Sequence, residues 1–208
     1  MKLHLSTALS LLLLLSLNNA FAADPKVQMV TSEGTVVLEL HADKAPATVA
    51  NFLRYVQDGK YDGTIFHRVI KGFMNQGGGF REDFTKVDTY DPIQNEADNG
   101  LRNKRGTIAM ARTGEPNSAT NQFFINTVDN GFLDHTAKTM RGWGYCVFGD
   151  VIEGMDVMDR IAQTPTGPGG PFGQDVPKTP VVIEKMSLIV EPKPEAGIPS
   201  APAALQLE

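Results

Sequence analysis

The sequence predicts a mainly β protein, in which an antiparallel sheet closes into a barrel with a helix at each end. Short β-prone runs recur along the chain, and clusters of glycine, asparagine and aspartate separate them. Only two stretches show the apolar spacing that is typical of helices. Many short strands combined with two isolated helices favour a closed barrel with the helices at its ends.

Local patterns predict a hairpin and then a helix after the first residues. Residues 27–30 and 35–40 are β-prone runs on either side of a turn at 31–34, which indicates a β-hairpin. Residues 43–59 predict a helix, because Pro46 is tolerated in a first turn and a glycine ends the segment. Its apolar residues share one helix face: Val49, Phe52, Leu53 and Val56.

The rest of the chain is also rich in β-prone runs. We expect short strands at 64–70, 73–76, 107–111, 122–126 and 145–151. Residues 81–105 are polar and rich in turn formers, which indicates a long surface loop. A second helix is predicted at 155–161 and a Gly/Pro-rich connection at 165–180. A last strand at 181–190 is expected to return and pair with the first strand.

Residues 1–22 have the pattern of a cleavable signal peptide. Lys2 precedes an apolar core at 11–17, and residues 20–22, Ala-Phe-Ala, give the small-x-small cleavage motif. The apolar run is shorter than the roughly 20 residues that span a bilayer, which argues against a membrane anchor. We therefore expect cleavage near Ala22, export of the mature protein and no membrane attachment after cleavage.

Residues 23–190 are expected to form one domain, and residues 191–208 a tail. Without residues 1–22 the 208-residue chain keeps 186 residues, enough for a substantial core. The tail is rich in proline and alanine and has few core-forming residues, which predicts disorder. The formal net charge is −5, or −6 without Lys2, and this balance argues against nucleic acid as the main partner.

The cysteine and glycine residues limit which kinds of site the chain can contain. Cys146 is the single cysteine, so an internal disulfide is excluded, and its apolar neighbours predict a buried small hydrophobe. With one cysteine and scattered histidines, a zinc site is not expected. The glycines at 77–79 are not followed by the Lys-Ser/Thr of a phosphate-binding loop, so a tight turn is the better interpretation. We expect neither a metal nor a cofactor.

Two segments carry the chemistry, FHRVIKGFMNQGGGF at 66–80 and RGTIAMARTGEPNSATNQFFIN at 105–126. They combine the cation Arg68 with apolar Phe73 and Met74 and with neutral amides, but offer no obvious nucleophile. Rotation of a prolyl peptide bond suits such a set, because it breaks no bond and faces a barrier of ~18–20 kcal/mol. A guanidinium stays charged and can stabilise the localised nitrogen lone pair of the twisted amide. Composition alone does not select this reaction.

The order and spacing of the motifs resemble the cyclophilins, a family of peptidyl-prolyl cis-trans isomerases. The matching pieces are FHRVIKGFMNQGG, GTIAMAR, NSATNQFFIN, GFLD and GYCVFGDVIEGMDV, and the resemblance covers about 27–190. It implies an eight-stranded antiparallel closed β-barrel capped by two α-helices. The signal peptide, the loop at 95–105 and the GYCVFG segment are most similar to the periplasmic A-type isomerases of Gram-negative bacteria, which implies a periplasmic location.

The resemblance also implies a role for each site residue, with Arg68 as the catalytic guanidinium. Apolar side chains would line the proline pocket: Phe73, Met74, Phe124 and Leu133. Two amides, Gln76 and Gln122, would hydrogen-bond the substrate or position the guanidinium. The groove for the residue before proline would be bordered by Met110, Ala111 and the backbone of Arg112.

Three positions depart from the best-known eukaryotic members. Phe132, Tyr145 and Arg112 stand where those members carry Trp, His and Asn. Because Phe lacks the indole N–H donor, we expect weak cyclosporin binding together with retained activity on short peptides. Phe132 and Tyr145 are further candidates for the pocket wall.

Other interpretations of single residues are weaker. His67 could act as a general base, but it alternates away from Arg68 along the strand. Ser118 with Asp134 and His135 could form a hydrolase triad, but no nucleophile-elbow pattern surrounds the serine.

The sequence therefore predicts a monomeric isomerase that acts on X–Pro bonds of unfolded or flexible exported proteins. A holdase-like module that binds extended Pro-containing chains is the alternative. Arg68 favours the enzyme, because a pure binder has no need of a guanidinium at the rotating bond.

Overall fold

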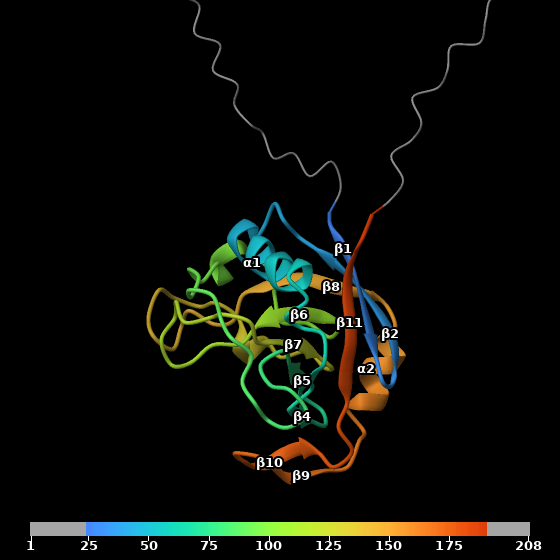
Figure 1. The fold of residues 1–208 in the computed structure, drawn as a ribbon. Helices are drawn as coiled ribbons and strands as arrows, with labels where there is room; N and C mark the ends of the chain where they lie inside the picture. Colours follow the sequence, from blue (N-terminus) through green and yellow to red (C-terminus); the bar gives the residue numbers. More distant parts are fainter. Residues whose placement is uncertain (1–23, 191–208) are drawn as a thin grey trace, which may run out of the picture.

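The structure is a computed structural model that describes residues 24–190 (Figure 1). The predicted signal peptide and the predicted tail lie outside the described residues. One sheet contains β1 (Lys26–Thr31), β2 (Gly34–Leu40), β3 (Thr64–Ile65), β4 (Arg68–Ile70), β5 (Met74–Gly77), β6 (Thr107–Met110), β7 (Phe123–Asn126), β8 (Val147–Glu153) and β11 (Val182–Ile189). The helices are α1 (Pro46–Gln57), α2 (Met155–Ile161) and two 3-10 turns, η1 (Ala97–Asn99) and η2 (Gly131–Leu133).

The sheet is curled, although within the described residues no strand pairing joins its two outer strands to close it. Its strand order is β3-β11-β1-β2-β8-β6-β7-β5-β4, and its two outer strands, β3 and β4, follow each other in the chain. Only Phe66 and His67 separate them, and the Phe66 N–H donates to the Val181 carbonyl at 3.0 Å. The predicted strand at 64–70 is therefore interrupted at this point, so the curled sheet has nine strands rather than the eight expected.

The predicted N-terminal hairpin and the returning last strand are confirmed. Strands β1 and β2 pair antiparallel with Met29 opposite Val36, and on its other side β1 pairs with β11, with Met29 opposite Met186. These three side chains are fully buried or nearly so. The first and last described strands are therefore neighbours in the barrel wall (Figure 1).

A further hairpin lies outside the barrel. Strands β9 (Thr166–Gly169) and β10 (Phe172–Pro177) pair with each other within the segment that the sequence predicted to be an irregular connection. Figure 1 shows this hairpin beyond the β4 and β5 end of the sheet, and β10 contacts β4. Glycine and proline are poor strand formers, so local propensity gave no sign of these two strands.

Helix α1 lies within the predicted range and buries its predicted apolar face. The ring of Phe52 lies 5.2 Å from that of Tyr61, 5.7 Å from Phe123 and 5.1 Å from Phe148, measured between centroids. The N-terminus of α1 has no side-chain cap from Ala45. Glu96 fulfils this role from the long loop, because its carboxylate accepts from the Thr48 N–H at 2.8 Å and the Ala47 N–H at 3.1 Å.

The loop at 81–105 is therefore more than a surface connection. Most of the loop is exposed or half-buried, as its polarity predicted, but Val87, Asn95, Ala97 and Asn103 are buried. Asparagine side chains can replace backbone partners inside a fold, and the side-chain Oδ1 of Asn95 accepts from the Ala97 N–H at 2.9 Å. Polarity alone does not report this local pairing.

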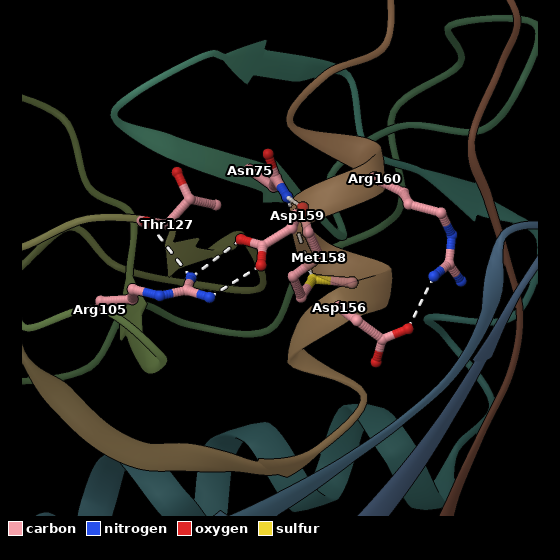
Figure 2. A network of polar contacts seen from close by, with 7 residues as sticks. All are labelled: Asn75, Arg105, Thr127, Asp156, Met158, Asp159 and Arg160. Atoms are coloured by element: carbon pink, nitrogen blue, oxygen red, sulfur yellow. Dashed lines mark hydrogen bonds and ion pairs between the residues drawn. The ribbon is translucent and has the colours of Figure 1, made fainter.

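Helix α2 coincides with its predicted range, contacts β2 and is hydrogen-bonded to the strand that carries part of the candidate site. The buried Asn75 of β5 donates from Nδ2 to the Met158 carbonyl at 2.9 Å (Figure 2). Asn75 Oδ1 has no partner within the described residues. Arg105 approaches α2 from the side, and both of its terminal nitrogens bond Asp159, at 2.9 and 2.8 Å. Among residues 24–190, no helix is long and apolar enough to cross a membrane.

Candidate active site

The register of four adjacent strands brings polar and apolar residues into one row. Arg68 on β4 stands opposite Gln76 on β5, Gln76 stands opposite Phe124 on β7, and Phe124 stands opposite Ala109 on β6. Directly opposed residues project from the same face of a sheet. The row therefore joins a cation, an amide and an aromatic ring on one face.

Hydrogen bonds connect the polar members of this row. Arg68 donates from Nη1 to the Gln76 Oε1 at 3.4 Å, and Gln76 donates from Nε2 to the Gln122 Oε1 at 2.9 Å. The Arg68 side chain is 42% exposed, and its Nε lies 3.9 Å from Asp175 Oδ2. Among the described residues, the second terminal nitrogen, Nη2, has neither a hydrogen bond nor an ion pair. The guanidinium is thus held loosely and keeps donors available.

The glycine run next to this row lets a side chain of the row lie close to the backbone. Gly78 has φ +83°, which only glycine adopts readily, as the predicted tight turn requires. A Cβ at Gly79 would lie 2.6 Å from the Gln122 side chain. The absence of a side chain at Gly79 therefore lets the Gln122 amide lie against the backbone and face Gln76.

An apolar cluster adjoins the row. Its buried members are Met74, Ala109, Phe124 and Val147, and the partly buried side chains packed against them include Phe73, Ala111, Leu133 and Tyr145. The Phe124 and Tyr145 rings meet edge to face, with centroids 5.7 Å apart and planes at 78°. Phe132 stacks on Phe73 at 5.6 Å and is 77% exposed, so it forms an outer rim.

Met110 is buried, and its role at the border of the groove stays a prediction. Its side chain belongs to the barrel core, because it alternates with Ala109 along β6 and points to the opposite face. Ala109, which sequence reasoning missed, is the β6 residue in the apolar cluster. The paired register of Ala109 and Phe124 is the signal that could have identified it.

Arg112 is bound to the surrounding loops. It donates from Nε to the Gly144 carbonyl at 2.8 Å and from Nη1 to the Thr113 carbonyl at 2.9 Å, and its guanidinium lies 4.8 Å above the Tyr145 ring. Together with Gln76, Ala111 and Gln122 it lines a pocket of about 170 Å³ beside the row. Gln76 and Gln122 thus face this pocket as well as Arg68.

A buried chain of amides, also missed from the sequence, supports the apolar cluster from behind. Asn130 donates from Nδ2 to the Phe73 carbonyl at 3.0 Å and to the Asn126 Oδ1 at 2.7 Å. Asn126 donates to the Asn103 Oδ1 at 3.2 Å, and Asn103 Nδ2 lies 3.4 Å from the Tyr145 carbonyl. All three asparagines are at most 2% exposed. They fix the backbone of two residues that border the cluster.

The alternative catalytic groups, His67 and Ser118, lie near this row but are buried or held in a turn. His67 is buried, and its ring packs between those of Phe80 and Phe172. Burial, with a smaller contribution from the Arg68 charge, lowers the pKa of His67 to about 4, although contacts with Ile65 and Gln122 oppose this. Ser118 accepts from the Thr113 N–H and donates to the Glu115 carbonyl, and no hydrogen bond joins it to His135 within 24–190. Ser118 therefore stabilises a turn.

Cys146 is buried, as predicted. Burial raises the pKa of its thiol to about 11, which disfavours the reactive thiolate. Across residues 24–190, no group of three or more His, Cys, Asp or Glu side chains is arranged to hold a metal ion.

Comparison with known proteins agrees with this geometry. Residues 26–188 match the family model described as cyclophilin type peptidyl-prolyl cis-trans isomerase/CLD. A peptidyl-prolyl cis-trans isomerase of Streptomyces antibioticus is 60% identical over 163 residues, which cover 78% of this chain and 98% of the relative. Peptidyl-prolyl cis-trans isomerase A of Dickeya dadantii is 52% identical over 187 residues, 89% of this chain and 96% of the relative.

The fold is also similar to a solved structure. A crystal structure of a cyclophilin type isomerase of Cryptosporidium parvum, obtained in the presence of the dipeptide ala-pro, covers 80% of this chain and 99% of its own. The two share 25% sequence identity, and the TM-score is 0.60.

Proposed function

The chain belongs to the cyclophilin-type peptidyl-prolyl cis-trans isomerases, and from this premise we propose that Arg68 carries out the isomerisation by electrostatic stabilisation alone. The apolar cluster around Phe124 would receive the proline ring, while the Arg68 guanidinium would donate to the prolyl nitrogen. The observation that carries this proposal is the partly exposed guanidinium with an unengaged Nη2, on the same sheet face as Phe124.

The proposed mechanism follows from what changes during rotation. In the planar amide the nitrogen lone pair is shared with the carbonyl and accepts poorly, whereas in the twisted amide it is localised. A donor placed at this nitrogen therefore stabilises the transition state more than the ground state, which is the requirement for catalysis. Gln76 and Gln122, linked at 2.9 Å, would hold a substrate carbonyl or the guanidinium itself.

The substrates we propose are X–Pro bonds of unfolded or flexible exported proteins. The Cryptosporidium parvum relative was crystallised in the presence of ala-pro, which supports short Pro-containing segments as ligands. The signal-peptide pattern at 1–22 supports a periplasmic location. No cofactor is needed, because no bond is broken.

A direct test measures cis/trans exchange of a short Ala-Pro peptide by NMR, with the parent protein, Arg68→Ala and the matched control Arg105→Ala. We expect acceleration by the parent and by the control, and at least a roughly tenfold loss in Arg68→Ala, equal to ~1.4 kcal/mol of barrier. A folded parent without acceleration would refute the enzyme. Equal rates in all three proteins would refute the role of Arg68.

The export proposal has its own test. The mass of the protein recovered from the periplasmic fraction should correspond to a chain that begins near Ala23. Recovery from the cytoplasmic fraction with residues 1–22 intact would contradict export.

The same Arg68→Ala variant separates the enzyme from a holdase-like module. Full suppression of client aggregation without isomerase activity would demonstrate that chain binding is separable from catalysis. We also propose weak cyclosporin binding, since the exposed ring of Phe132 carries no N–H donor. Phe132→Trp should tighten binding in a titration, and an unchanged affinity would argue against that explanation.

A further inference from the structure

The β9–β10 hairpin holds an unusual backbone feature close to Arg68. Among the described residues, only Phe84 and Asp175 adopt positive φ without being glycine, at +63° and +66°. Asp175 lies on β10, and Phe84 packs against the same hairpin. Such residues cost free energy and persist where the surrounding structure holds them, often at functional sites. Aspartate tolerates this backbone conformation better than most residues, and Asp175 Oδ2 accepts from the neighbouring Gln174 Nε2 at 3.2 Å.

Aromatic contacts hold the hairpin beside the row that contains Arg68. The Phe172 ring lies 5.4 Å from His67, stacked at 28°, and 5.1 Å from Phe80, edge to face at 86°. A side chain at Gly170 would overlap the ring of Phe84, so the hairpin backbone lies directly on that ring. His67 is the residue before Arg68, and therefore the hairpin is anchored one residue away from the candidate catalytic group.

This anchoring brings the Asp175 carboxylate to the Arg68 guanidinium. Oδ2 lies 3.9 Å from Arg68 Nε, and the Asp175 side chain is only 23% exposed. On the other edge of the guanidinium, Nη1 donates to Gln76 at 3.4 Å. The Asp175 carboxylate and the Gln76 amide thus flank the guanidinium on two sides. Within the described residues, Nη2 has no partner and remains available to a substrate.

We propose that Asp175 is a positioning residue for Arg68 and that the β9–β10 hairpin exists in part to present it. The carboxylate restricts rotation of the guanidinium plane from the Nε side, so that the free donor faces the row with Gln76 and Phe124. Asp175 itself does not touch the substrate. This inference rests on the proposed function of Arg68.

The test replaces Asp175 by Asn, which tolerates a positive φ and removes only the charge. The matched control is Asp159→Asn, which makes the same chemical change at the partner of Arg105. We expect Asp175→Asn to lower kcat on an Ala-Pro peptide about three- to tenfold, with KM and Tm nearly unchanged. The Arg68 Nε–H resonance should shift or broaden in Asp175→Asn and stay in place in Asp159→Asn.

A second variant, Phe172→Ala, releases the hairpin and leaves the carboxylate in the chain. It should reproduce both the loss in kcat and the change in the Arg68 resonance. An active parent with an equally active Asp175→Asn and an unmoved Arg68 resonance would overturn the inference and leave the isomerase intact. An inactive parent would instead refute the proposed function, while the resonance would still report whether Asp175 positions Arg68.

Discussion

The side chains of Arg68 and Arg105 are nearly equally exposed, at 42% and 44%, yet Arg105 makes more and shorter polar contacts than Arg68. Arg105 forms a bidentate ion pair with Asp159 and also donates to the Thr127 carbonyl at 3.3 Å (Figure 2). Arg68 makes one long hydrogen bond and one distant ion contact. Equal exposure therefore does not mean equal bonding: the number of occupied donors distinguishes Arg105 from Arg68, for which we propose a catalytic role.

The difference has a physical basis. A guanidinium offers five N–H donors in a fixed fork, and a carboxylate that accepts from two of them fixes its orientation and occupies one edge of the fork. Around α2 the charged groups are paired, Arg105 with Asp159 and Arg160 with Asp156, whereas Arg68 keeps a donor free. The four predictions below test this contrast, from the largest expected effect to the smallest.

The largest effect is expected from Arg68→Lys. Lysine keeps the charge but loses the planar fork, so kcat/KM on an Ala-Pro peptide should fall about thirtyfold, equal to ~2 kcal/mol. Arg105→Lys should remain within about twofold of the parent. Coupled peptide assays on both variants measure this, and equal losses would remove the contrast between the two arginines.

Glu96→Ala should destabilise the protein without affecting catalysis. The variant leaves the Ala47 and Thr48 N–H groups at the start of α1 without their acceptor, which costs about 1–2 kcal/mol of unfolding free energy. Urea unfolding gives the stability, and the isomerase assay gives the activity. A loss of kcat larger than the loss of folded protein would connect this loop to the site.

A smaller effect is expected from Arg105→Ala. The pair with Asp159 is about half-exposed, so its removal should lower the unfolding free energy by about 0.5–1 kcal/mol. Thermal unfolding in low salt is the suitable measurement, and 1 M NaCl should reduce the difference between variant and parent. A difference that salt does not change would mean that the effect is due to packing.

The smallest effect concerns His41, between Asp150 at 2.7 Å and Asp24 at 3.3 Å. Burial alone lowers the pKa of His41, but the two carboxylates outweigh it, so the net shift is upward. A raised folded-state pKa stabilises the protein below the ordinary pKa near 6.5, and this contribution is lost as pH rises through the raised value. His41→Gln should flatten the stability profile above pH 6 by a few tenths of a kcal/mol, a small amount because the site is partly solvated. An unchanged slope in urea titrations across this range would contradict the shift.

Much of the row that joins Arg68, Gln76 and Phe124 could be predicted from the sequence, because its members lie on short strands with regular alternation. Arg68, Gln76 and Phe124 meet through cross-strand register, and their segments also carry the family resemblance. The side chain of Met110 lies in the barrel core, whereas Ala109, one position earlier in that same alternation, lies in the apolar cluster. The core of α1 was predictable for a similar reason, since its periodicity is local.

Other parts of the site depend on contacts between distant segments. Asp175 reaches Arg68 only through the packing of Phe172, and its hairpin lies in a Gly/Pro-rich tract without strand propensity. The asparagines at 103, 126 and 130 resemble loop residues by composition, but tertiary partners satisfy their amides in the interior. Neither arrangement leaves a local pattern in the sequence.

The pairing of β1 with β11 determines when folding can finish. On one side residues 26–31 pair with the nearby β2, but on the other side their partners lie at 183–189, so the sheet cannot be completed before almost the whole domain has been synthesised. Pairings between such distant segments slow the folding of β proteins, because a long loop must close before the contacts form. A chain truncated before residue 182 would expose an unpaired edge on β1, which is a site for aggregation. An unfinished chain of this protein would therefore depend on other factors to remain soluble until its last strand arrives.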